Sequence, residues 1–334
     1  MNVPLTQISI ATMQAAEGFA AGRVFPIIPV VHQSDRWYVY TRDAWLRDDV
    51  EPRAPATEST GNGFDLDNSP TYACVPYAHH FDVADQIRRN QDLAINLDRD
   101  ATLFVTAKQL LKRERVFVQR YCSTGIWTGT ASGNDQTGVG ATPGADQFLQ
   151  WDLAGSTPIM DVRKRKLESA QKTGFAPNVL LIGPYVANGL INNAEIVDRI
   201  KYSQLGFVDY ALLAQAFGVD EVVVPTAIYN VGAEAPYVQG SPNFVSSTFA
   251  PAFIHSNYAL LAYRPPAPGP LATTAGYIFV WRGYLGGMEW LQVKKFRMEQ
   301  LAADRVESES AFDMKTILTD HGVFFNTPVS AAAL

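Results

Sequence analysis

Charged residues are scarce in this chain. Of its 334 residues, 18% are Asp, Glu, Lys or Arg, whereas soluble proteins carry about a quarter. The cores of protein–protein interfaces are depleted in charge, so the shortage indicates that neighbouring molecules cover much of the surface. A monomer with a thin polar surface is the alternative.

Basic residues are in the minority. The chain has 27 Lys and Arg residues against 33 Asp and Glu residues, which gives a net charge of −6 at pH 7. Proteins that read a nucleic-acid sequence tightly present basic surfaces, so the charge argues against that class. A container that encloses nucleic acid without binding it tightly remains compatible with the composition.

The chain has only two cysteines and no long apolar run. Cys74 and Cys122 lie among apolar or aromatic neighbours, which predicts reduced core residues. No run approaches the roughly eighteen apolar residues of a membrane-spanning helix, and residues 1–22 contain no Lys or Arg. We therefore expect no membrane span and no secretory signal, and we expect synthesis and assembly in a cytoplasm.

Recognisable catalytic and cofactor motifs are also missing. The glycine-rich segment 138–144 resembles a dinucleotide-binding fingerprint, but no apolar strand precedes it and no periodic helix follows. His79 and His80, near Asp82, suggest a metal site, yet adjacent strand residues point to opposite faces. We expect no active site, cofactor or metal; an α/β enzyme with a site built from scattered residues is the alternative.

A long helix is the clearest local prediction. Between Asp98 and Tyr121, apolar residues recur at spacings of three, four and seven, which predicts a helix about 35 Å long. The expected apolar face consists of Leu103, Ala107, Leu110, Leu111, Phe117, Val118 and Tyr121. Asp98 is the expected N-terminal cap, and residues 112–115 place charge on the side away from the apolar face.

The middle of the chain predicts a compact α/β unit. The stretch from 177–183 through 211–218 to 222–230 reads as a short buried strand, two or three helices and another apolar strand, with no catalytic residue among them. A further helix follows Pro158, and its basic run 163–166 spreads around the helix. This favours a solvated face; contact with packaged nucleic acid is the alternative.

The region before the long helix predicts extended structure. Two prolines within residues 23–29 disfavour a helix there. Residues 36–41 and 71–77 are rich in aromatic and β-branched residues and read as strands, whereas residues 48–70 are polar and turn-rich. A loop this long is uncommon in a compact domain and has too few apolar residues to fold alone, so a partner is implied.

The order of these elements resembles that of the major capsid proteins of tailed bacteriophages, which share the Hong Kong 97-type fold. The resemblance covers residues 23–326 and rests on the order of its parts: arm, aromatic strand, polar excursion, returning strand, long helix and α/β block. Its most specific segments are Asp82–Arg88, Leu97–Ala101, Thr173–Leu180, Asp198–Tyr202 and Phe217–Asn230.

The resemblance implies an α+β fold in five segments. They are an N-terminal arm (1–35), an extended loop over a neighbouring subunit (36–80), a peripheral domain (81–172) with spine helix 98–121, an axial domain (173–285) and a return to the peripheral domain (286–334).

The resemblance also implies a shell protein without catalysis, whose copies assemble through pentamers and hexamers into an icosahedral head around double-stranded DNA. Aromatic residues and Arg are enriched among interface anchors. We expect six residues to contact other subunits: Trp37, Tyr38, Tyr40, Trp45, Arg47 and Phe25. Packing of Trp37 and Tyr40 within their own subunit is the alternative.

The partners implied are further copies of the chain, a scaffolding protein, a portal protein and, in some shells, a decoration protein. Packaged double-stranded DNA would be touched weakly and without sequence preference, and no membrane is involved. The expected location is the virion capsid, assembled in the host bacterial cytoplasm. An encapsulin-like compartment shell, which uses the same fold to enclose cargo enzymes, is the alternative.

Two departures from the family pattern matter. Some members join subunits covalently through a lysine of the extended loop and an asparagine elsewhere, but this chain has no lysine before Lys108. We therefore expect non-covalent shells. Few residues precede the aromatic strand, too few for the long helical scaffolding segment of some members, so we expect a separate scaffolding protein or none.

Overall fold

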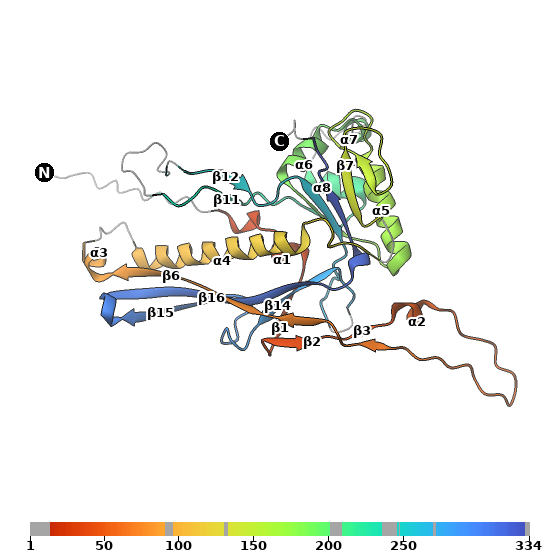
Figure 1. Cartoon of the computed structure of the whole chain (residues 1–334), viewed down its shortest axis with the longest axis horizontal. Helices are drawn as coiled ribbons and strands as arrows, with labels where there is room; N and C mark the ends of the chain where they lie inside the picture. Colours follow the sequence, from red (N-terminus) through yellow and green to blue (C-terminus); the bar gives the residue numbers. More distant parts are fainter. Residues whose placement is uncertain are drawn as a thin grey trace.

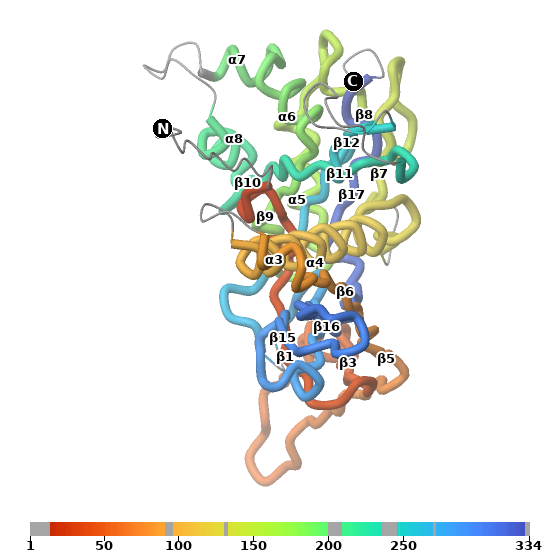
Figure 2. The backbone as a smooth tube through the Cα atoms, turned by 90° about the vertical axis from the view of Figure 1, so that its left-hand side faces the viewer, coloured from red at the N-terminus to blue at the C-terminus, as the bar shows by residue number. Residues whose placement is uncertain are grey.

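Two β-sheets, one long helix and a projecting loop make up the chain in a computed structural model (Figure 1). The structure describes residues 14–90, 96–129, 133–200, 209–235, 246, 248–269 and 272–330. The long helix lies between the two sheets when the molecule is turned by 90° (Figure 2).

The five-stranded sheet is built around one strand of 14 residues, β16 (Ala303–Thr316). Both β6 (Val75–Ala84) and β15 (Gln292–Met298) pair antiparallel with β16, one on each side of its first half. β14 (Gly276–Trp281) pairs with the end of β16, and β1 (Ile27–Val30) lies parallel to β14 at the edge. One strand therefore holds three others in register.

The long helix α4 (Leu97–Tyr121) lies along β6 and β16, so the predicted helix 98–121 is confirmed (Figure 1). The predicted cap is wrong. Asn96 caps the helix, because its side-chain oxygen accepts a hydrogen bond from the Arg99 backbone N–H at 3.1 Å. Asp98 lies in the first turn, where the helix dipole stabilises a carboxylate. Its side chain makes ion pairs rather than a capping hydrogen bond.

The buried face of α4 also differs from the predicted one. Ala101 and Val105 pack on Val306 of β16, whereas Leu103, expected on the apolar face, is 40% exposed. Glu114, expected on the charged side, is completely buried. The helix is covered on two sides, which a single apolar stripe in the sequence does not reveal.

The six-stranded sheet has the strand order β10-β9-β13-β17-β7-β8. Pairing is antiparallel between β13 and its two neighbours and parallel elsewhere. The strands are β7 (Asp135–Val139), β8 (Gln147–Leu149), β9 (Val179–Ile182), β10 (Glu221–Val223), β13 (Tyr258–Ala262) and β17 (Gly322–Asn326). Every residue of β9 and β13 is buried, because both faces of the sheet are covered.

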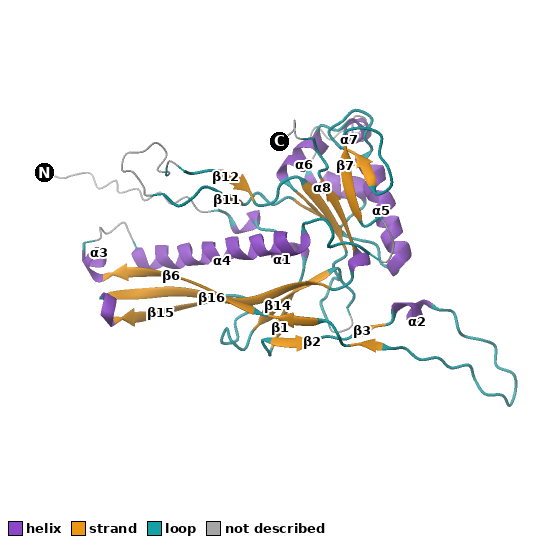
Figure 3. Cartoon of the chain, in the orientation of Figure 1, coloured by secondary structure: helices purple, strands orange, loops and turns teal. Residues whose placement is uncertain are grey.

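Four helices cover one face of this sheet (Figure 3). They are α5 (Pro158–Thr173), α6 (Pro184–Ile191), α7 (Ala194–Ile200) and α8 (Tyr210–Phe217). The helix predicted after Pro158 is thereby confirmed. α5 and α8 both end at glycines with left-handed backbone, Gly174 (φ 79°) and Gly218 (φ 71°), the conformation that glycine adopts most easily.

The other face of the six-stranded sheet joins the five-stranded sheet through one core. One buried cluster contains residues of both sheets and of α4. Its members include Leu181 and Leu260 from the six-stranded sheet, Ile278 from the five-stranded sheet and Phe117 of α4. The C-terminal part of α4 therefore sits where the two sheets meet.

Short elements complete the described chain. They are α1 (Ala21–Val24), α2 (Arg42–Leu46), α3 (Asp85–Arg89), β2 (Ser34–Arg36), β3 (Val39–Tyr40), β4 (Leu66–Asp67), β5 (Thr71–Ala73), β11 (Ile228–Asn230), β12 (Pro251–Phe253) and the 3-10 turns Ala16–Gly18, Glu299–Leu301 and Thr319–His321.

The two sheets divide the chain differently from the predicted segments. Residues 135–172, placed with the spine helix in segment 81–172, belong to the six-stranded sheet and its helices, whereas β14, placed in segment 173–285, belongs to the five-stranded sheet. β17 lies in segment 286–334 yet joins the six-stranded sheet. Strand partners far apart in sequence decide this division. The peripheral and axial positions in a shell stay predictions.

Candidate inter-subunit surfaces

The extended loop leaves the body as a narrow ribbon, and hydrogen bonds join its two strands at the base. β3 pairs antiparallel with β4. The backbone N–H and the hydroxyl of Thr41 both donate to the Asp65 carbonyl oxygen, at 3.1 and 2.8 Å, and the Asp65 N–H donates back to the hydroxyl at 3.1 Å. Beyond this point, residues 42–64 project away from the rest of the chain (Figure 1).

Three aromatic rings form a cluster at the start of the projecting part. The ring centroids of Tyr40 and Phe64 lie 5.3 Å apart, those of Trp45 and Phe64 5.7 Å, and those of Tyr40 and Trp45 6.1 Å. We call Tyr40, Trp45 and Phe64 the aromatic cluster. The loop thus has a small ordered centre of its own, which the polar composition of residues 48–70 did not predict.

The aromatic cluster is still largely open to solvent. Tyr40, Trp45 and Phe64 are 37%, 66% and 51% exposed, and the neighbouring Leu46 and Leu66 are 62% and 50% exposed. An apolar patch of this kind is typical of protein–protein contacts. Because the rings are already packed on one another, binding a partner would order few additional side chains.

An ion pair ties the base of the loop to the six-stranded sheet. The guanidinium of Arg42, the first residue of α2, lies 2.8 Å from a carboxylate oxygen of Asp320, whose side chain is only 5% exposed. Asp320 belongs to the turn just before β17. An ion pair with a nearly buried carboxylate therefore fixes the direction in which the loop leaves the body.

The structure places the predicted contact residues in three settings. Tyr38, Tyr40, Trp45 and Arg47 are exposed or nearly so, and Arg47 makes only a distant ion pair with Asp43 at 3.9 Å. Their contact with another subunit stays a prediction.

Trp37 packs mainly within its own subunit. Its ring stacks on Phe279 of β14 with centroids 5.5 Å apart and belongs to the small core between that strand and the loop base. In the isolated chain, Trp37 therefore has the alternative position, packed within its own subunit.

The expected contact through Phe25 is wrong. Phe25 has no exposed surface, and its ring lies 4.5 Å from that of Tyr121 and 5.8 Å from that of Phe117. It closes the central core from the N-terminal side, because the chain turns inward at α1 before it reaches β1. A position beside two prolines suggested an exposed arm, and only the folded chain shows the turn.

Sequence reasoning missed Phe64 and Arg42. Phe64 stands alone in a stretch of Gly, Asn and Asp, and its role depends on the pairing of β3 with β4 across the loop. An isolated aromatic residue in a polar loop was the available signal. For Arg42 no local pattern points to Asp320, which lies 278 residues away.

A buried carboxylate anchors the N-terminal segment. The Glu114 oxygens accept hydrogen bonds from the backbone N–H groups of Ala20 and Ala21 at 2.7 and 3.0 Å, and one of them lies 2.5 Å from Nε2 of His255. The Tyr258 hydroxyl lies 2.7 Å from Nδ1 of the same imidazole. Burial holds the pKa of Tyr258 well above its usual range, so this hydroxyl stays protonated.

This arrangement fixes where the N-terminal segment leaves the body. Glu114 is in α4, His255 precedes β13 and Ala20 precedes α1, so one side chain joins three separate parts of the chain. A buried carboxylate that loses its partners costs several kcal/mol. The segment from residue 14 to α1 therefore has a defined position on the long helix.

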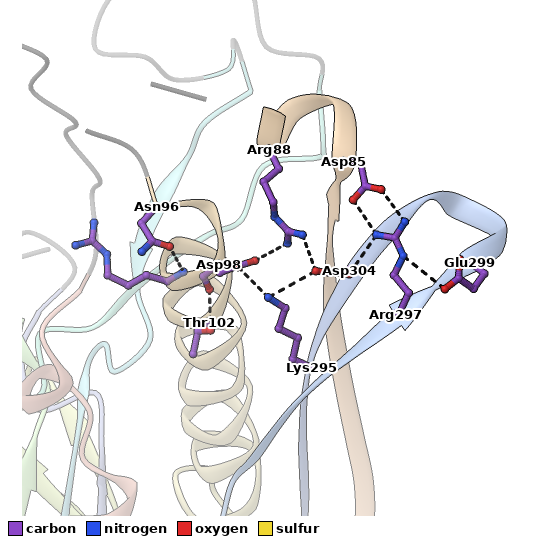
Figure 4. A network of polar contacts seen from close by, with 10 residues as sticks. Asp85, Arg88, Asn96, Asp98, Thr102, Lys295, Arg297, Glu299 and Asp304 are labelled. Atoms are coloured by element: carbon purple, nitrogen blue, oxygen red, sulfur yellow. Dashed lines mark hydrogen bonds and ion pairs between the residues drawn. The ribbon is translucent and has the colours of Figure 1, made fainter. Parts of the chain in front are cut away.

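The end of the five-stranded sheet away from the loop is held by a network of ion pairs (Figure 4). Arg88 bridges Asp98 and Asp304 at 2.7 and 2.6 Å, and Lys295 also contacts Asp98, at 2.8 Å. Hydrogen bonding from Lys295 lowers the pKa of Asp98, and hydrogen bonding from Arg88 lowers that of Asp304. Arg297 pairs with Asp85 beside them.

This network joins α3, the start of α4 and the β15–β16 hairpin. The cations of β15 are thus matched by carboxylates of the same subunit. The three elements are consequently fixed relative to one another.

The sequence also raised the questions of a metal site and a membrane-spanning helix. In the part of the chain that the structure describes, no three His, Cys, Asp or Glu residues are grouped to hold a metal ion. His79 faces Phe104, whereas His80 lies 4.0 Å from Asp82, so the two histidines do point apart. Across the same residues, none of the helices combines the length and the apolar character needed to cross a bilayer.

The two cysteines are free and buried, as predicted. Burial raises the pKa of the Cys74 thiol to about 12. Burial likewise raises the pKa of Cys122. Both thiols therefore stay protonated and unreactive near neutral pH.

Comparison with known proteins gives one similar sequence and several similar structures. The chain is 24% identical over 225 residues to the major capsid protein of Burkholderia phage BcepMu, which covers 67% of this chain and 68% of that protein. No protein-family model matches this chain.

The structural similarity spans nearly the whole chain. A phage-related protein from Bordetella bronchiseptica RB50 superposes with a TM-score of 0.69 at 17% identity, covering 94% of each chain. The capsid of cyanophage P-SCSP1u gives 0.60 at 10% identity, covering 98% of this chain and 92% of that one. The SrpI encapsulin of Synechococcus elongatus PCC 7942 gives 0.54 at 13% identity, with coverage of 98% and 92%. These similarities confirm the predicted α+β fold of the Hong Kong 97 type.

Proposed function

We infer that this chain is a major capsid protein of the Hong Kong 97 type, whose copies form the head shell of a tailed bacteriophage. The observation that carries this inference is its sequence similarity to a phage major capsid protein over two thirds of both chains. The fold agrees with it. The loop with its open aromatic cluster is the kind of surface that a shell subunit needs.

We propose that the extended loop docks on a second copy of the chain. Trp45 and Phe64 remain largely exposed on a loop that projects away from the rest of the described chain (Figure 1), so a neighbour would cover them. Interfaces of standard size bury about 1,600 Å² in total. A subunit that exchanges a loop and an N-terminal segment with its neighbours would exceed that area.

The assembled shell would be icosahedral and built from pentamers and hexamers. Ring assemblies need a head-to-tail contact between two different surfaces of the subunit, and a loop docking on another face provides such a pair. The shell would enclose double-stranded DNA, with scaffolding, portal and decoration proteins as further partners, and would be assembled in the host cytoplasm. The chain itself would perform no catalysis.

A compartment shell is the second candidate. The similarity to the SrpI encapsulin supports it, because the same fold then serves a container for protein. The fold does not distinguish the two functions. The contents of the particle do.

Electron microscopy of the purified protein in negative stain, supported by light scattering, tests the proposal. Closed icosahedral shells, or rings of five and six subunits, are the expected result, and nucleic acid inside particles from infected cells favours the phage head. Cargo protein inside the particle would favour the compartment. A species of one or two subunits at high concentration would contradict both.

A further inference from the structure

Three cations form a line along one side of α4. Lys108, Lys112 and Arg115 are spaced by four and three residues, which places them on the same face of a helix. All three are exposed. From Lys108 to Arg115 the line runs about 10 Å along the helix axis. We call these three residues the basic stripe.

The basic stripe has no carboxylate partner in the described part of the chain. Each cation lies over an aromatic ring instead: Lys108 over Phe104, Lys112 over Tyr77 and Arg115 over Tyr229, at 5.3, 5.0 and 4.8 Å from the ring centroids. Cation–π contacts hold such side chains against the surface while their charge stays available.

Positive charge is concentrated on this helix although the protein is acidic. The chain has a net charge of −6, yet α4 contains twice as many basic as acidic residues. The acidic residues are already occupied: Asp98 pairs with Arg88 and Lys295, Asp100 pairs with Arg99, and Glu114 is buried on His255. The charge of the basic stripe therefore remains uncompensated within the helix.

We propose that the basic stripe contacts the phosphates of the DNA enclosed by the shell. The proposal rests on the function inferred above and names the surface through which that shell meets its contents. A row of point charges on a straight helix fits a phosphate backbone, which carries one negative charge per about 1.7 Å of duplex.

The acidic loop of a neighbouring copy fits the basic stripe less well. One of its carboxylates, Asp49, already accepts a hydrogen bond from Asn62 at 2.5 Å. The exposed part of the loop is dominated by the aromatic cluster, which calls for an apolar surface. Contact between the loop and the stripe is the outcome that would replace the proposal.

The proposal predicts the salt dependence of DNA binding. For duplex DNA, the slope of log K against log salt is about −0.9 for each phosphate neutralised. Removing three phosphate contacts should make the slope less steep by about 2.7. Between 50 and 200 mM salt this difference corresponds to a change of about 40-fold in relative affinity.

The experiment uses the full-length protein, kept unassembled, and a labelled 30-base-pair duplex as the probe. Fluorescence anisotropy at increasing NaCl concentration gives the slope for the wild type and for the triple variant Lys108→Gln, Lys112→Gln, Arg115→Gln. The control variant Arg89→Gln, Arg120→Gln, Arg282→Gln removes three exposed cations outside the basic stripe that also lack carboxylate partners in the described chain. Electron microscopy records whether each protein forms shells.

The expected result is a slope reduced by about 2.7 in the stripe variant and unchanged in the control, with shells formed by all three proteins. An unchanged slope in the stripe variant, or an equal reduction in the control, overturns the proposal. So does loss of shells in the stripe variant with its DNA binding intact, because the stripe would then contact another subunit. If the wild type forms no shells, the proposed function fails, whatever the slope.

Discussion

Replacing Trp45 by Ala tests whether the aromatic cluster is an interface anchor. The side chain is 66% exposed in the isolated chain. A fully buried aromatic side chain removes about 150–250 Å² from water, so about 100–165 Å² of Trp45 remains for a partner to cover. At about 25 cal/mol per Å², that area contributes about 2.5–4 kcal/mol to each docked loop.

The same change affects the isolated subunit much less. Only the buried third of the side chain is lost from the subunit, which costs about 1–2 kcal/mol at most by the same conversion. The cluster lies on a ribbon away from the main core, so most of this loss concerns the loop alone. Assembly and subunit stability should therefore separate.

The assay is the critical concentration for shell formation, followed by light scattering, with urea unfolding of the unassembled subunit in parallel. An assembly loss of 2.5 kcal/mol raises the critical concentration by about 60-fold, since about 1.4 kcal/mol is a factor of ten. Leu167→Ala is the matched control, because Leu167 is also an exposed apolar residue, 72% exposed on α5. It should leave the critical concentration close to that of the wild type.

Two results would refute the reasoning. A critical concentration for Trp45→Ala within a few-fold of the wild type would mean that no partner covers this ring. A fall in subunit stability as large as the assembly loss would mean that Trp45 stabilises its own subunit and that the assembly effect is indirect.

Three further predictions concern the interior and the chemistry of the shell. Glu114→Gln should lower the free energy of unfolding by about 3 kcal/mol, because it weakens a buried carboxylate's bonds to two amides and His255. The exposed Glu289→Gln should change the free energy of unfolding by less than about 0.5 kcal/mol in the same urea titration. Equal effects of the two changes would contradict the role of Glu114 in holding the N-terminal segment. Burial lowers the pKa of His321 to about 4, whereas the unfolded imidazole binds its proton near pH 6.5, so stability should fall by about 3 kcal/mol between pH 7 and pH 4; a flat pH profile, or the same profile in His321→Asn, would disprove this. Because no lysine precedes Lys108, dissociated shells should run as a 36.7 kDa monomer on a denaturing gel, and a ladder of covalent multimers would be the contrary result.

Local patterns predicted the elements whose environment is simple. The helix 98–121 was readable from its periodic apolar residues, and the strand within 177–183 was readable from its continuous apolar run.

The errors arise where a distant segment covers a residue. Glu114 lies in a charged run, and only the arrival of Ala20 and His255 makes it a buried acceptor. Phe25 lies beside two prolines, and only α4 encloses it. A one-dimensional pattern records which side chains are apolar, but it does not record which segments meet in space.

The candidate surface was predictable in part. The aromatic and β-branched run at 36–41 pointed to Tyr38 and Tyr40, and the length of the excursion pointed to a partner. Phe64 and Arg42 depend on pairings across 24 and 278 residues, and no local signal specifies those.

The position of β16 and β17 in the sheets has a consequence for synthesis. β16 holds together the strands of one sheet and β17 lies between β13 and β7 in the other, yet both come from residues 303–326. Neither sheet can close until these residues have left the ribosome, and pairing over such long sequence separations is slow. A nascent chain therefore carries its loop and N-terminal segment without the body that would present them until β17 has been made, and subunits become competent to join a shell only after that point.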